Sequence, residues 1–189
     1  MRASANLQRS AERLKSLIDD LFVFTRTRLG DTLPIEPTQQ DFRKICRGAV
    51  DEVRAARPDA QIAVQTTGEL GGIWDAGRLN QLVINLVTNA VQHGCGAVRL
   101  EVTRDDEQIV LAVSNGGPPI PARALPTLFD PLTRAAPLSG HKDASSGAGL
   151  GLYICRGIAH AHRGTIGVAS DESGTVFTVR TPRLPEPTQ

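Results

Sequence analysis

The stretch that most constrains the fold is Ser145 to Tyr153, which reads Ser-Ser-Gly-Ala-Gly-Leu-Gly-Leu-Tyr. Glycine stands at every second position from Gly147 to Gly151, and an apolar pattern at helical spacing begins at Leu152. The run predicts a glycine turn that opens a helix. The first N–H groups of a helix have no partner within it and lie at its positive end, so an anion, most naturally a phosphate, can bind there.

A glycine run of this kind can also be a plain flexible turn. Two familiar phosphate loops are excluded, because no Gly-Lys-Ser/Thr follows, as a P-loop requires, and no hydrophobic strand precedes, as a dinucleotide fingerprint requires. The glycines follow a polar stretch from Asp130 to Ser146. Loops longer than about 12–15 residues are uncommon in compact domains unless they act as lids or are disordered. We therefore expect a lid.

Composition excludes several functional classes. With 21 basic and 20 acidic residues the net charge is +1, and no basic stripe interleaved with aromatics suggests a nucleic-acid partner. No apolar run of membrane-spanning length and no secretory signal occur, so we expect a cytoplasmic chain without membrane contact. The three cysteines, Cys46, Cys95 and Cys155, match neither a disulfide framework nor a zinc spacing, and we expect reduced core residues.

The N-terminal segment, residues 1–30, reads as one long helix over 2–29 with apolar residues alternately four and three apart. A single helix cannot bury the apolar stripe that this spacing creates. We therefore expect a partner helix, in this chain or in a second copy that would form a homodimer. Residues 31–38 contain two prolines and read as a linker. The main domain is expected at 39–182, and 183–189 reads as a tail.

Within the main domain, periodicity predicts both helices and strands. Helices are expected at 39–56, 75–93 and 151–162, with a short helical piece at 125–129. Strands are expected at 61–66, 97–103, 108–114, 165–169 and 175–180. This is an α+β pattern.

The helix at 75–93 carries Asn85, Asn89 and His93 four residues apart, hence on one face beside the apolar stripe. Burying an amide without a hydrogen-bond partner costs about 1–3 kcal/mol, so asparagines beside an apolar stripe are expected to have partners. One interpretation is hydrogen bonding to nearby backbone. The other is a metal–phosphate site, because an amide oxygen is a hard, neutral ligand that suits Mg²⁺.

Five motifs in this order resemble those of sensor histidine kinases. The N box corresponds to 85–93, the G1 box to 113–121, the F box to 128–131, the G2 box to 147–152 and the last glycine motif to 174–175. The sequences Gly-Ile-Trp-Asp at 72–75 and Asn-Gly-Gly-Pro-Pro-Ile-Pro at 115–121 are most similar to those of kinases of the bacteriophytochrome type. Helix 2–29 resembles the second helix of their dimerisation and phosphotransfer hairpin.

This resemblance implies a two-layer α/β sandwich, a mixed sheet covered by helices on one side, that binds ATP and Mg²⁺. Asn89 would hold the metal and Asn85 would support it, and both would be catalytic. Phe129 would anchor the lid, and Ile120 would lie against adenine; both can equally be plain core residues. Arg134 would reach the phosphates or be a solvated charge. The implied nucleotide-binding residues are His93, Asn115, Gly117, Ile120, Phe129, Arg134, Gly147, Gly149, Leu150, Gly151, Leu152 and Thr175.

The sequence departs from the family pattern at four points. Asn115 replaces the G1 aspartate that accepts a hydrogen bond from adenine, so weaker nucleotide binding is expected. Gln92 replaces the N-box lysine, and Arg163 replaces a glycine. No histidine is followed by an acidic residue, as the phosphoacceptor histidine requires.

The resemblance therefore implies a protein-histidine kinase that is inactive alone and transfers phosphate to a histidine supplied elsewhere. Its partners would be a phosphoacceptor domain, which becomes the phosphoprotein, and a response regulator. Two alternatives remain. One is an ATPase of the same fold, which is disfavoured because Asn85 stands where hydrolytic members have a glutamate. The other is a degenerate module that binds partners without turnover.

Overall fold

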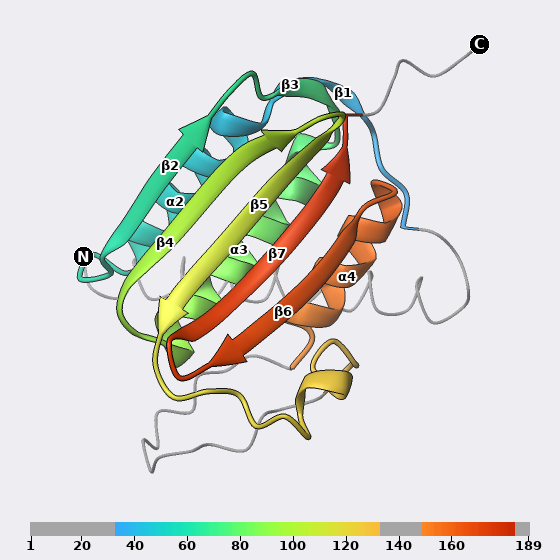
Figure 1. Cartoon of the computed structure of the whole chain (residues 1–189). Helices are drawn as coiled ribbons and strands as arrows, with labels where there is room; N and C mark the ends of the chain where they lie inside the picture. Colours follow the sequence, from blue (N-terminus) through green and yellow to red (C-terminus); the bar gives the residue numbers. More distant parts are fainter. Residues whose placement is uncertain (1–32, 133–148, 184–189) are drawn as a thin grey trace, which may run out of the picture.

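The computed structural model describes residues 33–132 and 149–183. These residues form a mixed five-stranded sheet with helices packed on one face (Figure 1). The helices are α2 (Phe42–Ala56), α3 (Ala76–His93) and α4 (Gly151–Ala161), and the strands are β2 (Ile62–Thr67), β4 (Cys95–Asp105), β5 (Gln108–Gly116), β6 (Thr165–Asp171) and β7 (Gly174–Pro182). A second, two-stranded sheet consists of β1 (Thr38–Asp41) and β3 (Gly71–Trp74), and a 3₁₀ turn, η1, spans Leu125–Thr127. The predicted two-layer sandwich is confirmed.

The strand order β2-β4-β5-β7-β6 makes β5 the central strand. The β2–β4 pair is parallel, and the β4–β5, β5–β7 and β6–β7 pairs are antiparallel. After α4 the chain continues through β6 into β7, and β7 pairs with β5 on the side away from β4. Asn115 at the end of β5 thereby lies opposite Thr175 at the start of β7.

The core lies between the sheet and its helices. On β5, Ile109, Leu111 and Val113 are completely buried, while the residues between them face the open side of the sheet. Each buried aliphatic side chain stabilises the fold by roughly 1.5–3 kcal/mol. The helices contribute stripes at helical spacing, and the buried residues of α3 are Leu79, Leu82, Val83, Leu86, Val87 and Ala90.

The helix predicted from residue 39 begins instead at Phe42, and this prediction is wrong for its first three residues. They belong to β1, which pairs antiparallel with β3, a strand that the sequence analysis did not identify. The carboxylate of Asp41 accepts a hydrogen bond from the Arg43 N–H at 2.9 Å and caps α2. A Cβ on Gly72 would come within 2.3 Å of the Trp74 ring, so packing of the indole requires glycine in β3.

The other expected elements within the described residues are confirmed to within a few residues. The carboxylate of Asp75, the first residue of the predicted helix, accepts from the Arg78 N–H at 3.0 Å and caps α3. Arg183, at the start of the expected tail, donates from its side chain to the Gly71 carbonyl at 2.6 Å and from its N–H to the Glu107 carbonyl at 2.9 Å. The helix predicted at 2–29 and most of the predicted lid lie outside the described residues. No described helix is long and apolar enough to cross a membrane.

The cysteine prediction is correct in part. None of the three cysteines forms a disulfide within the described residues, and Cys46 and Cys155 are buried, but Cys95 is exposed at the start of β4. Burial, with a smaller contribution from the negative charge of Asp41, raises the pKa of the Cys46 thiol to about 12. Cys46 is therefore a structural core residue, and Cys95 is not.

His162, directly after α4, is fully buried and joins α4 to the start of α3. Its Nε2 accepts from the Asp75 N–H at 3.1 Å, so Nδ1 carries the proton and donates to the Ile158 carbonyl at 2.9 Å. Burial lowers the pKa of His162, and the Ile158 hydrogen bond and the charge of Asp75 offset only part of this effect. The imidazole is thus held neutral.

Arg163 has φ of +57°, a left-handed conformation that costs a non-glycine residue about 1 kcal/mol. Its N–H donates to the His160 carbonyl at 2.8 Å, which closes the end of α4. This geometry explains why the family pattern has glycine here. Arg163 thus has a structural role at the end of α4.

The neutral His162 should make stability depend on pH. The unfolded histidine protonates near its ordinary pKa of 6.5, whereas the folded one resists protonation. The stability that the neutral His162 contributes is therefore present above the unfolded pKa and is lost as the pH falls toward the lower folded pKa. Urea unfolding at pH 7.5 and 5.5 measures this loss. His162→Gln should be less stable at pH 7.5 and lose less between the two values; an unchanged pH-dependent loss would contradict the assignment.

Candidate functional site

The site begins with the polar stripe of α3. Asn85 and Asn89 are partly buried beside the apolar stripe, and His93 is exposed at the end of the helix. The Nδ2 of Asn85 donates to the Gly151 carbonyl at 3.4 Å. This bond crosses from α3 to the first turn of α4, so the asparagine face of α3 borders the beginning of α4.

The beginning of α4 has no side-chain cap. Leu150 stands at the N-cap position, where it cannot accept a hydrogen bond through its side chain, and the first helical bond runs from the Ile154 N–H to the Leu150 carbonyl. The N–H groups of Gly151 and Leu152 therefore have no partner within the helix. Gly149 has φ of +71°, which requires glycine in practice. The described part of the glycine turn thus presents free donors at a positive helix end.

A second cluster lies at the paired ends of β5 and β7. Thr175 is 6% exposed, and its Oγ1 lies 2.7 Å from the Ser170 Oγ. The same serine oxygen accepts from the Ile120 N–H at 2.9 Å. Ser170 therefore connects two predicted site residues, and Asn115 lies beside them opposite Thr175 in the sheet.

Close backbone approach fixes the Asn115 corner. A Cβ on Gly94 would lie 2.6 Å from the Asn115 Nδ2, and a Cβ on Gly174 would lie 2.3 Å from the Asn115 carbonyl oxygen. Gly117, with φ of +135°, continues the turn after β5. The Nδ2 of Asn115 donates to the Gly116 carbonyl at 2.9 Å, so its Oδ1 is the atom left to accept a hydrogen bond from a ligand.

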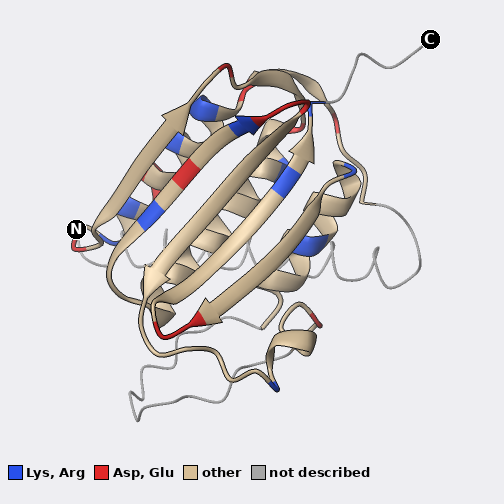
Figure 2. Ribbon diagram, in the orientation of Figure 1, with Lys and Arg blue, Asp and Glu red and all other residues tan. Residues whose placement is uncertain are grey.

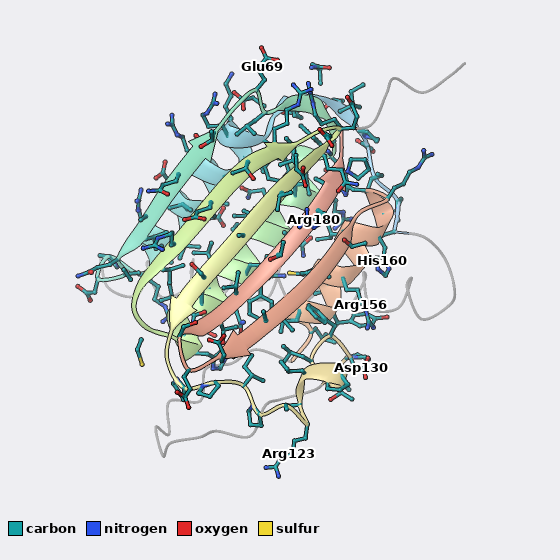
Figure 3. All side chains as sticks on the ribbon, viewed as in Figure 1. Glu69, Arg123, Asp130, Arg156, His160 and Arg180 are labelled. Atoms are coloured by element: carbon teal, nitrogen blue, oxygen red, sulfur yellow. The ribbon has the colours of Figure 1, made fainter. Side chains whose placement is uncertain are left out.

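The F-box residues support the described ends of the chain on either side of 133–148. The rings of Phe129 and Phe177 meet edge to face with centroids 6.3 Å apart, which anchors this turn on β7. Asp130 lies 3.5 Å from Arg156 of α4, and the two side chains lie close together in Figure 3. The Leu132 N–H donates to the Gly149 carbonyl at 3.1 Å, so the two ends are hydrogen-bonded to each other.

The fold and these clusters agree with comparisons to known proteins. Residues 74–185 match the family described as histidine kinase-, DNA gyrase B- and HSP90-like ATPase. The chain belongs to this family. The predicted catalytic domain of the sensor histidine kinase type is confirmed.

Three relatives illustrate the similarity. The chain is 35% identical over 178 residues to the signal transduction histidine-protein kinase AfsQ2 of Streptomyces coelicolor, covering 93% of this chain and 32% of that protein. It is 28% identical over 179 residues to a bacteriophytochrome of Pseudomonas aeruginosa, covering 94% and 24%. The catalytic domain of histidine kinase ThkA superposes with a TM-score of 0.67 at 27% identity, covering 80% of this chain and 100% of that one. The chain thus spans about a third or less of the two curated relatives.

In this ATPase domain, the structure brings the predicted residues together in two groups. One contains Asn85, Gly149, Leu150 and Gly151, with Asn89 one helical turn beyond Asn85 on α3. The other surrounds the paired ends of β5 and β7, and its predicted members are Asn115, Gly117, Ile120 and Thr175. Arg134 and Gly147 lie outside the described residues.

Sequence reasoning missed two residues of the ATPase domain that the structure adds to the site. Ser170 carries no motif signal, since a serine near the end of a strand is ordinary. Gly94 directly follows the predicted helix 75–93, and nothing in the sequence indicates that its missing Cβ accommodates Asn115. The roles of both residues depend on contacts between β5, β7 and the end of α3, which the sequence does not show.

The chemistry of the donor set fits a magnesium ion only in company with phosphates. No group of three or more histidine, cysteine, aspartate or glutamate residues suited to a metal occurs within the described ranges. Asn89, one helical turn beyond Asn85 on the same face, offers a neutral amide oxygen. Mg²⁺ is commonly held by one or two protein groups, substrate phosphates and water, and this set matches that pattern.

Replacing Gly94 tests the close approach to Asn115. Gly94→Ala should destabilise the fold by roughly 1–3 kcal/mol, because its Cβ would meet both the Ala90 carbonyl at 2.5 Å and Asn115. Thermal unfolding measures this loss. Gly167→Ala is the matched control, since nothing lies within 4 Å of that added Cβ. Equal unfolding temperatures for the two variants would contradict the geometry.

Proposed function

We propose that this domain binds ATP with Mg²⁺ and donates the γ-phosphoryl group to a histidine on another segment or chain, as the catalytic portion of a two-component sensor histidine kinase. The observation that carries the proposal is the hydrogen bond from Asn85 to Gly151, which joins the amide stripe of α3 to the uncapped first turn of α4. Free N–H donors beside amide oxygens suit a magnesium–triphosphate group.

The proposed roles follow from this arrangement. The first N–H groups of α4 and the His93 side chain bind the phosphates, and Asn89 holds Mg²⁺ with support from Asn85. Mg²⁺, when bound, neutralises charge on the phosphate oxygens. At the other end, the Asn115 Oδ1 accepts from the adenine amino group, and Ile120 lies against the adenine ring. Thr175 and Ser170 hold the side of the site formed by the strand ends in position. The protein's contribution is mainly positioning and charge stabilisation.

Transfer to a histidine is favoured over hydrolysis. Hydrolysis needs a base that removes a proton from water, and the amide of Asn85 cannot do so. A histidine nucleophile needs no such base at this position. The proposed partners are accordingly a phosphoacceptor histidine domain and a response regulator, with residues 2–29 as a proposed dimer contact and the cytoplasm as the proposed location.

A second candidate function is a module that binds partners without turnover. The observation that favours it is the state of Asn115, whose side chain is uncharged and already donates to the Gly116 carbonyl. A neutral acceptor binds an amino group more weakly than a carboxylate does. This candidate predicts no phosphoryl transfer even when a histidine-bearing hairpin is supplied.

Calorimetric titration with a non-hydrolysable ATP analogue, with and without Mg²⁺, tests the proposed function first. We expect Mg²⁺-dependent binding that Asn89→Ala weakens about tenfold or more, because the variant loses a metal ligand. In a transfer assay with an added phosphoacceptor hairpin, the same variant should lose activity.

Asn80→Ala is the matched control, since it removes an amide from the same helix near Gly48 of α2 and away from the site. It should bind the analogue as the parent does. Absence of binding at millimolar analogue would refute the proposal. Binding without any transfer would favour the non-catalytic module.

The family pattern at Asn115 gives a further test. Asn115→Asp should bind the ATP analogue about tenfold more tightly, because a charged acceptor forms a stronger hydrogen bond with the adenine amino group. Asn115→Leu, of similar volume, should bind more weakly than the parent. Calorimetry measures both, and thermal unfolding monitors the fold. Equal affinity of all three proteins would exclude Asn115 from the adenine site.

A further inference from the structure

Strand β2 forms one edge of the sheet that the structure describes, where its neighbour is β4. Backbone N–H and C=O groups of successive strand residues point to opposite edges. The Gln61 carbonyl accepts from the Val98 N–H at 2.8 Å, so this residue faces β4. The backbone groups of Ile62, Val64 and Thr66 therefore face outward.

Two arginines of α2 occupy the ends of this outward edge. Arg54 donates from Nη2 to the Ile62 carbonyl at 2.7 Å, and Arg43 donates from Nη2 to the Gly68 carbonyl at 3.1 Å. Between them, the outward N–H and C=O of Val64 have no hydrogen-bond partner within residues 33–132 and 149–183. Covering an edge protects it against unwanted pairing. Among the described residues, Arg54 covers this edge at Ile62, and Arg43 covers it at Gly68 and at Thr66, whose hydroxyl accepts from the Arg43 Nε at 3.1 Å.

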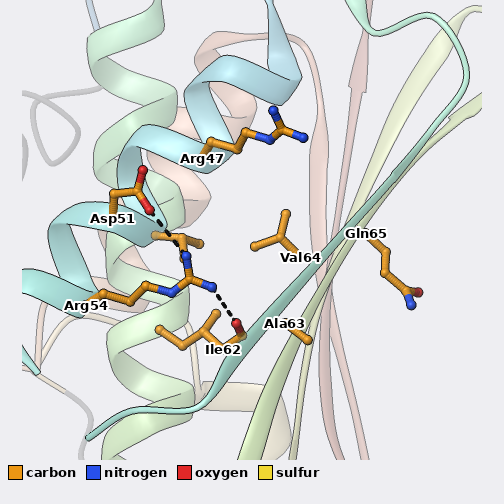
Figure 4. A pocket seen from close by; sticks show the side chains of 8 residues that line it. Arg47, Asp51, Arg54, Ile62, Ala63, Val64 and Gln65 are labelled. Carbon is orange, nitrogen blue, oxygen red and sulfur yellow. Dashed lines mark hydrogen bonds and ion pairs between the residues drawn. The ribbon is translucent and has the colours of Figure 1, made fainter. Parts of the chain in front are cut away.

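A groove of about 460 Å³ lies beside the uncovered part, between α2 and β2 (Figure 4). Val50, Ile62 and Val64 give it an apolar floor. Arg54 at its rim is paired with Asp51 at 3.3 Å. Arg47 at the same rim is exposed and has no ion pair among the described residues. The groove thus combines apolar surface, unpaired backbone groups and an available guanidinium.

The surrounding charge favours an acidic ligand. Blue segments follow α2 behind β2 in Figure 2, and the helix carries four cationic residues against two acidic ones. The acidic ones are Asp51, which is already paired with Arg54, and Glu52. Arg43 is likewise paired, with the cap residue Asp41 at 3.6 Å. An approaching carboxylate therefore meets a net positive rim.

We propose that this groove binds an extended acidic segment of a partner protein, added to the sheet as a strand beside β2. Backbone groups of the segment would pair with those of Val64 and Thr66, an apolar side chain would contact Val50 and Val64, and a carboxylate would pair with Arg47. Side chains on one face of a strand recur every second residue, so the segment needs an acidic residue two positions from the apolar one, and glutamates on both sides of a valine satisfy this in either strand direction. The proposal does not depend on nucleotide binding.

The test uses the full chain, isotopically labelled for NMR, and the peptide acetyl-Thr-Glu-Thr-Val-Thr-Glu-Thr-amide. Saturable amide shifts should be confined to β2 and the facing side of α2. A peptide with lysine in place of both glutamates should bind at least about tenfold more weakly. Absence of saturable shifts at millimolar peptide, or equal binding of the lysine peptide, would overturn the proposal.

Two protein variants separate the groove from general electrostatics. Arg47→Glu should weaken binding about tenfold, whereas Lys44→Glu makes the same charge change on α2 outside the groove lining and should change it much less. Both positions are exposed, so both variants should fold, and thermal unfolding checks this. Equal weakening by the two variants would refute recognition in the groove.

Strand addition is tested on the peptide itself, without changing the protein. Two peptides, N-methylated at alternate sets of residues, should differ, because only one edge of the added strand pairs with β2. The peptide whose paired edge is methylated should lose binding, and the other should retain it. Equal affinities would overturn the strand geometry.

Discussion

Helix α3 must serve the core and the candidate site at the same time, and the domain depends on how its faces are divided. Its leucines are completely buried against the sheet and the neighbouring helices, while Asn85 and Asn89 stand at the border of that buried face. Each residue advances about 100° around the axis, so a small rotation of the helix would expose a leucine or bury an amide. Burial of one leucine contributes roughly 1.5–3 kcal/mol, and a stranded amide costs a similar amount. The core therefore fixes the direction of the asparagines.

The sequence revealed the parts of the fold whose local pattern and tertiary role agree. Helix α3 has a long apolar period, an aspartate cap and a glycine at its end, and its predicted bounds are confirmed. Strand β3 has two glycines in four residues, so its propensity opposes its structure. It forms because β1 pairs with it and because Trp74 packs over Gly72. The pairing with β1 joins distant segments, and no local window contains it.

The site was predictable to the extent that its residues lie in motifs. Asn85 belongs to a row of polar residues at helical spacing, and Gly149 belongs to a run of alternating glycines. Both patterns indicate a phosphate or metal site from sequence alone. Ser170 and Gly94 do not, because each acts through a neighbour that the sheet brings near: Ser170 through Thr175, and Gly94 through Asn115. A glycine that ends a helix and a glycine that admits a side chain are identical in sequence. The two roles of Gly94 are distinguished only by the structure, in which the end of α3 lies against Asn115 of β5.

The two proposed binding regions lie in different parts of the domain. The candidate nucleotide site involves α3, α4 and the ends of β5 and β7, whereas the groove lies between α2 and the opposite edge strand β2. Helix α2 packs on α3 through buried apolar residues, and Arg47 is on its exposed side. A segment that pairs with Arg47 leaves that packing unchanged. It would therefore act by holding a partner near the domain, which raises the partner's effective concentration without altering the geometry at Asn85 and Asn89.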